Sequence, residues 1–202
     1  SNNKAELDAA HVPQWFIDSC LKIGYLFPRA HAVAYVMMAF RIAWFKVYQP
    51  LAYYAAYFTI RAEGSFNAPV ILKGLESQKA ELARIAALEH STAVEKGNAT
   101  VIEVAAEMYL RGMEFLPIDL DRSDASEFKM VDGKLLPPFN CIPALGDAVA
   151  KEIVRARDEH LFTSKEDLKK RGKVSQSIID TMDSMGILKN MPDEEQISLF
   201  SF

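Results

Sequence analysis

The sequence feature that most restricts the fold is a run of apolar side chains over residues 30–48, which recur three and four positions apart. That spacing places them along the face of a helix. Pro28 before the run and Gln49-Pro50 after it set the predicted limits of the helix. A second helix is predicted directly afterwards, over residues 51–61. Two apolar helices in succession predict a mainly helical domain.

The same region has an uneven charge. From Ser19 to Ala62 the sequence contains no Asp or Glu, but it contains five Lys and Arg residues and eleven aromatic residues. Aromatic rings among fixed positive charges suit unpaired nucleotides, because bases stack on rings and phosphates pair with cations. The alternative is a pair of core helices that happens to be basic.

One face of the first helix carries polar and cationic side chains. His31, Tyr35 and Arg41 lie within about a third of its circumference, because successive residues are about 100° apart. Arg29 and His31 stand at its N-terminus, where free amides and the helix dipole favour an anion such as a triphosphate. We therefore expect these two residues beside such an anion, although a single histidine is often only a surface residue.

Further helices are predicted in the middle of the chain. Apolar spacing predicts one helix over residues 69–90, followed by a turn at Gly97-Asn98. A further helix is predicted over residues 101–111, with Thr100 as its N-cap and Gly112 at its end.

Short strands are predicted next, over residues 115–120 and 128–136, with a hairpin turn at Asp132-Gly133 in the second. Three nearby carboxylates could suggest a divalent metal site, but no base or nucleophile accompanies them. We assign neither a metal site nor a catalytic residue, and expect these carboxylates to be solvated. They are Asp119, Asp121 and Asp124.

Residues 142–153 resemble a helix-hairpin-helix element, whose core is Gly-hydrophobic-Gly with Ala four residues after the second Gly. Gly146 and Ala150 match this pattern, and Ala144 replaces the first glycine. A tight turn before a helix presents several amides to one phosphate. If Ala144 needs a positive φ, its side chain costs roughly 1 to 2 kcal/mol. The alternative is an ordinary corner between two helices.

A second, more degenerate copy follows. Residues 161–168 open a helix, Gly172-Lys173-Val174-Ser175 forms the turn, and Gly186 ends the next helix. A basic cluster, Lys169, Lys170, Arg171 and Lys173, surrounds the turn. The residues predicted to contact DNA in the two copies are Leu145, Gly146, Asp147, Ala148, Lys151, Arg155, Lys170, Arg171, Lys173, Val174 and Ser175.

The last residues put large apolar side chains on a chain end, where ends fray unless a contact holds them. Gln-x-x-Leu-Phe resembles the pentapeptide by which bacterial replication and repair proteins attach to the sliding clamp. Residues 192–195 are predicted to be a solvated spacer before it, and the alternative is a tail that folds back. The predicted clamp-binding residues are Gln196, Ile197, Ser198, Leu199 and Phe200.

Composition adds limits rather than a function. The two cysteines, Cys20 and Cys141, have neither metal spacing nor a disulfide pattern. The longest uncharged apolar run, residues 32–40, is shorter than the roughly 20 residues of a membrane helix. We therefore expect a soluble cytoplasmic protein with no membrane partner. The first residue is Ser1 rather than Met, and we expect a part of a longer protein.

Six short segments stand in one order along nearly the whole chain: residues 11–16, 27–35, 45–50, 137–143, 170–175 and 196–200. Together they resemble the C-terminal end of the PolC-type alpha subunit of bacterial DNA polymerase III. The resemblance implies a fingers segment at residues 1–64, a connecting helical and short β region at 65–136, tandem helix-hairpin-helix at 137–191 and a clamp-binding tail at 192–202. The expected fold is mainly α with a small β-hairpin.

The resemblance also implies partners: primer-template duplex, the sliding clamp (the beta subunit), and an incoming dNTP held together with a palm domain. The palm aspartates that hold Mg²⁺ in the family should lie upstream, so we expect no cofactor in this chain and no activity from it alone. The expected location is the replisome at the bacterial nucleoid. The implied nucleotide-binding residues are Phe27, Arg29, His31, Tyr35 and Arg41.

Two other classes of protein remain open. One is a free-standing helix-hairpin-helix DNA-binding or repair accessory protein with a clamp-docking tail. The other is a pure interaction protein that uses the acid-free segment as core and does not contact nucleic acid.

Overall fold

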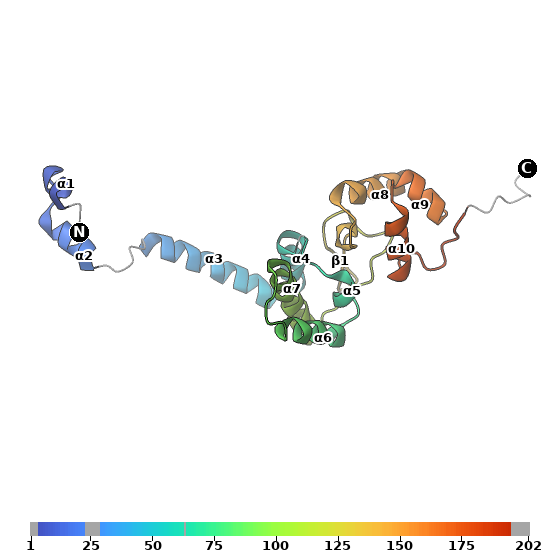
Figure 1. The fold of residues 1–202 in the computed structure, drawn as a ribbon, viewed down its shortest axis with the longest axis horizontal. Helices are drawn as coiled ribbons and strands as arrows, with labels where there is room; N and C mark the ends of the chain where they lie inside the picture. The colour runs from blue at the N-terminus through green and yellow to red at the C-terminus, as the bar shows by residue number, and fades with distance from the viewer. Residues whose placement is uncertain (1–3, 23–28, 63, 195–202) are drawn as a thin grey trace, which may run out of the picture. The chain divides into compact units, whose positions relative to one another are not determined.

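A computed structural model describes residues 4–22, 29–62 and 64–194 (Figure 1). The predicted residues Phe27 and Pro28, and the predicted clamp-binding residues 196–200, lie outside these ranges. The fold is mainly α with one two-stranded antiparallel sheet, which confirms the predicted class. The chain divides into two compact units, Ser1–Trp44 and Phe45–Phe202, and each is described by itself.

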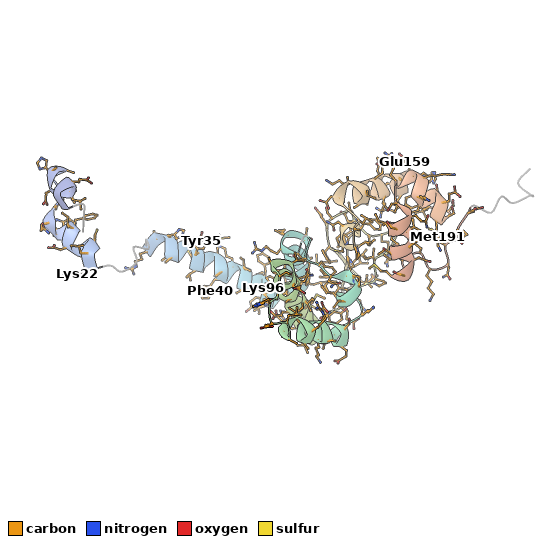
Figure 2. All side chains as sticks on the ribbon, in the orientation of Figure 1. Lys22, Tyr35, Phe40, Lys96, Glu159 and Met191 are labelled. Carbon is orange, nitrogen blue, oxygen red and sulfur yellow. The ribbon has the colours of Figure 1, made fainter. Side chains whose placement is uncertain are left out.

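The first unit contains α1 (Lys4–Ala9), α2 (Gln14–Lys22) and most of α3 (Arg29–Tyr48), which matches the predicted first helix. None of the residues of α3, all of which the structure describes, is buried. Tyr35 and Phe40, which Figure 2 labels on this helix, have side chains that are 65% and 74% exposed. By length and composition alone, α3 could also cross a membrane. Those two properties are weak grounds, because core helices share them. Among the described residues of its unit, α3 presents a large exposed apolar surface.

The second unit begins with the last turn of α3, which α7 (Ala93–Leu110) holds in place. Lys46 Nζ lies 2.8 Å from Glu107 Oε2, and Arg111 Nη2 donates to the Lys46 carbonyl at 2.8 Å. Arg111 also donates to the hydroxyl of Tyr54 at 3.1 Å. Arg111 thus binds the carbonyl of Lys46 and the hydroxyl of Tyr54 together, which fixes the last turn of α3 within this unit.

Residues 68–110 contain three helices, α5 (Ala68–Ile71), α6 (Leu75–Ala86) and α7, and these correct two predictions. The single helix predicted over residues 69–90 is broken at Gly74, whose φ is +97°. The helix predicted to begin after Thr100 begins earlier, because Thr92 and Glu95 form a capping box. The predicted turn at Gly97-Asn98 is therefore helical, whereas Gly112 has a φ of +80° and ends the helix as predicted.

The small sheet confirms the predicted hairpin. Strands β1 (Lys129–Val131) and β2 (Lys134–Leu136) pair antiparallel across Asp132 and Gly133, which have φ of +50° and +75°. The other predicted strand, residues 115–120, was wrong as a strand: Phe115 makes one isolated bridge to Leu135.

The core is built around Phe58 of α4 (Pro50–Arg61), which is 1% exposed. Its ring centroid lies 5.6 Å from that of Phe66, 5.2 Å from that of Phe115 and 5.5 Å from that of Phe128. These rings come from four separate segments, so the core joins α4 to the loop and sheet that follow. The core therefore contains aromatic residues of α4. This agrees, for α4, with the alternative in which the acid-free segment forms core helices.

Candidate nucleic-acid interface

The two predicted hairpins have the same backbone conformation. The first connects the 3₁₀ helix η1 (Phe139–Cys141) to α8 (Asp147–Glu159), and the second connects α9 (Lys165–Arg171) to α10 (Gln176–Ser184). Ala144 and Lys173 occupy the left-handed position, with φ of +63° and +53°. Two residues later, Gly146 and Ser175 are the N-caps, with φ/ψ of −80°/162° and −71°/158°. The repeat predicted from sequence is therefore also a structural repeat.

Each turn inserts one apolar side chain into the core and leaves backbone amides at the following helix start. Leu145 is 4% exposed and Val174 is 2% exposed, so either residue could contact DNA only through its backbone. In the stretch 137–191, described without gaps, the amides of Asp147, Ala148, Gln176 and Ser177 have no acceptor. Such amides are ready donors for an anion.

Gly172 is required for close packing and not for an unusual backbone conformation. Its φ is −79°, which any residue can adopt. A Cβ there would lie 2.7 Å from the Leu168 carbonyl oxygen and 3.2 Å from Val174 Cγ2. The absence of a side chain therefore lets the end of α9 approach the second turn closely.

Ala144 has a positive φ, so its side chain is expected to destabilise the first turn. We expect Ala144→Gly to raise the free energy of unfolding by about 1 kcal/mol, since glycine adopts this conformation without a Cβ clash. The matched control is Ala80→Gly in the exposed interior of α6, which should lower stability by about 1 kcal/mol. Urea denaturation measures both, and the same sign for the two variants would contradict the assigned strain.

The cations near the second turn differ in how firmly they are held. Lys170 pairs with Glu166 at 3.1 Å, and Lys169 Nζ lies 3.0 Å from Gln176 Oε1 at the start of α10. Lys151, within the gap-free stretch 137–191, makes no ion pair. Lys169 was not among the predicted DNA contacts, although its contact with α10 brings it to the turn. These exposed side chains are able to turn toward a phosphate.

Arg171 is held in place by the protein. Its guanidinium pairs with Asp167 at 2.9 Å, donates to the carbonyls of Ala156 and His160, and lies 4.8 Å from the centre of the Phe162 ring. With these contacts made, Arg171 ties α9 to the end of α8. The geometry thus favours a structural role for this member of the predicted set.

Glu152 on α8 connects the two hairpins. Its Oε1 lies 2.9 Å from Lys173 Nζ and 2.9 Å from Arg155 Nη2, and its Oε2 accepts from Arg155 Nε at 3.0 Å. Arg155 also pairs with Glu159, which Figure 2 labels at the end of α8. Hydrogen bonds from Arg155, and then from Lys173, lower the pKa of Glu152 to about 2. This carboxylate is therefore ionised throughout the neutral range.

Sequence analysis missed a buried arginine that holds α8 in position. Arg157 is 9% exposed and donates to the Ser123 carbonyl at 2.6 Å, fixing α8 on the loop before the sheet. The sequence pattern that could have identified Arg157 is its position on the same apolar face of α8 as Ile153. In that loop Asp119 and Asp124 accept backbone amides and pair with cations, so they form turns instead of being merely solvated.

The surroundings of the two turns also differ. A cavity of about 500 Å³ borders the first turn, and its lining carries no charged side chain; amides of Asn67, Asn98 and Asn140 contribute to it. The second turn has Lys169, Lys170 and Lys173 around it. Cationic side chains therefore lie around the second turn but not in the lining of the cavity at the first, and two of them, Lys170 and Lys173, are paired with Glu166 and Glu152.

The predicted spacer after residue 191 is exposed but attached. The Lys165 amide donates to the Pro192 carbonyl at 2.9 Å, and the Glu166 amide donates to the Asp193 carbonyl at 3.0 Å. Lys165 Nζ also lies 3.0 Å from Asp193 Oδ1 and 3.2 Å from Asp183 Oδ2. The start of the predicted tail is thus fixed beside the first turn of α9.

On α3, the predicted stripe is present. The rings of His31 and Tyr35 lie 4.4 Å apart, and Arg41 Nη1 lies 3.9 Å from Met38 Sδ. Arg29, His31, Tyr35 and Arg41 belong to one helix. In the described residues no cluster of three or more metal-ligating side chains occurs.

Comparison with known proteins agrees with this geometry. A family model described as "Helix-hairpin-helix motif" matches residues 112–197. Proteins named "DNA polymerase III PolC-type" are similar: that of Thermotoga maritima is 50% identical over 197 residues, 98% of this chain and 14% of the relative. Those of Pediococcus pentosaceus and Bacillus subtilis are 52% and 50% identical, each over 96% of this chain and 14% of the relative. The chain thus resembles a portion of these polymerases and spans 14% of their length.

Proposed function

We propose that this chain is a DNA-holding part of a bacterial replicative DNA polymerase, and that it grips primer-template duplex by the phosphate backbone. The pair of hairpins carries the proposal, because two turns of one conformation each precede a helix whose first amides have no acceptor in the gap-free stretch 137–191. Such amides bind phosphate without distinguishing sequence. A polymerase needs this kind of contact, because it holds every sequence that it copies.

The grip depends on local charge, not on net charge. Residues 137–191 contain nine Lys and Arg and eight Asp and Glu, so the region as a whole is almost neutral. Lys169, Lys170 and Lys173 cluster at the second turn, and Lys151 lies on α8. The second hairpin is therefore the stronger phosphate contact, and the first adds amides of Gly146, Asp147 and Ala148.

The experiment that tests duplex binding measures the affinity of the chain for a labelled primer-template by fluorescence anisotropy. Three lysine–phosphate contacts predict that the affinity falls about 40-fold between roughly 50 and 200 mM salt, because counterions are released on binding. An affinity that does not change with salt would overturn the proposal and leave the protein-interaction alternative.

We assign α3 to the side of the incoming nucleotide. Its exposed apolar residues need cover, and a neighbouring polymerase domain supplies that cover more readily than a lipid bilayer, given the cations Arg29, Arg41 and Lys46. Arg29 and His31 stand at the N-terminus of α3, where an anion is stabilised. Chemistry itself requires Mg²⁺ held by carboxylates elsewhere in the polymerase, so this chain alone is expected to be inactive.

The nucleotide assignment predicts a kinetic change in the full-length polymerase. We expect Arg29→Ala to raise KM for dNTP about tenfold, as loss of one charge-assisted phosphate contact implies. Arg61→Ala, at the exposed end of α4, removes the same charge and should leave KM unchanged. Steady-state primer extension measures both, and wild-type kinetics for Arg29→Ala would exclude a phosphate contact.

The tail is proposed to bind the sliding clamp through Gln196, Leu199 and Phe200. Phe200→Ala should weaken clamp binding about tenfold, because a buried aromatic side chain contributes roughly 1.5 to 3 kcal/mol. Ser201→Ala lies outside the pentapeptide and should have no effect. Surface plasmon resonance with immobilised clamp measures both variants. If Phe200→Ala lowered duplex affinity equally, the tail would belong to the core instead.

A further inference from the structure

Glu152 lies at a position where it affects both hairpins. It is a residue of α8, in the first hairpin, but its carboxylate contacts Lys173 of the second turn at 2.9 Å. Its side chain is 17% exposed, compared with 72% for Lys173 and 57% for Arg155. The carboxylate is thus the fixed partner, and the two cations extend outward from it.

Lys173 lies close to the start of α10, so its pairing with Glu152 affects the place where a phosphate would bind. Lys173 occupies the left-handed position of the second turn, two residues before the N-cap Ser175 of α10. A phosphate at that helix start would use the same ammonium that Glu152 now binds. A carboxylate and a phosphate compete for one cation, and two anions close together repel each other.

We infer that Glu152 is a built-in competitor of DNA phosphate, which keeps the grip of the second hairpin weaker than its lysines alone would make it. This inference rests on the proposed duplex binding. A weakened grip fits a protein that must advance along DNA, because every backbone contact has to break and re-form at each step. Specific binders, by contrast, gain from maximal contact.

Other carboxylates near the hairpins differ from Glu152. Glu166 pairs with Lys170 within α9, and Glu159 pairs with Arg155 within α8. Glu152 contacts cations of both hairpins at once and is less exposed than either. Removing its charge therefore releases Lys173, whereas Arg155 still pairs with Glu159.

The test is Glu152→Gln, which keeps the size and the oxygen acceptor but removes the charge. We expect the affinity for primer-template duplex to rise about fivefold at roughly 50 mM salt, because Lys173 no longer has a carboxylate that competes with the phosphate. Glu81→Gln is a closely matched control. Glu81 and Arg84 on α6 make the same i,i+3 pair, with contacts of 2.8 and 2.9 Å and a Glu side chain 19% exposed. Its affinity should equal that of the wild type.

A double-mutant cycle identifies the route. If the gain depends on Lys173, Glu152→Gln should raise affinity clearly less in a Lys173→Gln background. An equal gain in both backgrounds would overturn competition at Lys173. Affinity of Glu152→Gln at or below that of the wild type would overturn the inference while leaving duplex binding intact. Salt-independent binding by the wild type would instead refute the proposed function itself.

Discussion

Phe58→Ala is expected to lower the free energy of unfolding of the unit Phe45–Phe202 by about 3 to 5 kcal/mol. The side chain is 1% exposed, and its ring packs against those of Phe66, Phe115 and Phe128. Alanine would lose the transfer free energy of the ring and leave a cavity among three rings that come from other segments. Because these segments are distant in the sequence and are also joined by hydrogen bonds, such as that from the Phe128 amide to Thr59 Oγ1, the cavity cannot close without shifting several of them.

The matched control is Phe40→Ala. Phe40 is 74% exposed on α3, so its truncation should change stability by less than about 0.5 kcal/mol. Chemical denaturation followed by near-ultraviolet circular dichroism reports the packing of the aromatic core directly. A loss below about 1 kcal/mol for Phe58→Ala would mean that the aromatic cluster is not the centre of this core.

The sequence predicted helix limits well where proline set them, as at α3 and α4, because proline restricts the backbone locally. Glycine was less informative. Gly97 was predicted to lie in a turn, but it lies within α7. A Cβ there would be 3.2 Å from Ser65 Oγ, so the glycine lets α7 pack closely against Ser65. The capping box of Thr92 and Glu95 was a local signal that could have placed the start of α7 correctly.

The hairpins show a similar limit. Gly146 and Ala150 identified the first turn, and the motif raised a positive φ at Ala144 as one possibility. In the second turn that position is Lys173, a residue for which no propensity predicts a positive φ. The contact of Lys173 with Glu152 joins the second turn to α8, and local patterns do not contain such pairings. The sequence therefore identified the two turns but not the charge pairing between them.

The largest functional effect is expected from Lys169→Gln, Lys170→Gln and Lys173→Gln combined. These side chains surround the second turn, where α10 begins with amides that have no acceptor in the gap-free stretch 137–191. If each lysine neutralises one phosphate, the triple variant should lose duplex affinity on the order of 100-fold at roughly 50 mM salt. Its salt dependence should also flatten by about 2.7 in the slope of log affinity against log salt.

The control for that triple variant removes three positive charges elsewhere, as Lys73→Gln, Lys79→Gln and Lys96→Gln on or beside α6 and α7. Both triple variants have the same net charge, so long-range attraction to DNA changes similarly in each, and only loss of local contacts separates them. Anisotropy titrations at several salt concentrations give the affinity and slope of each protein. Equal losses in the two variants would mean that DNA responds to the overall field of the chain, and the second hairpin would then have no special part in binding.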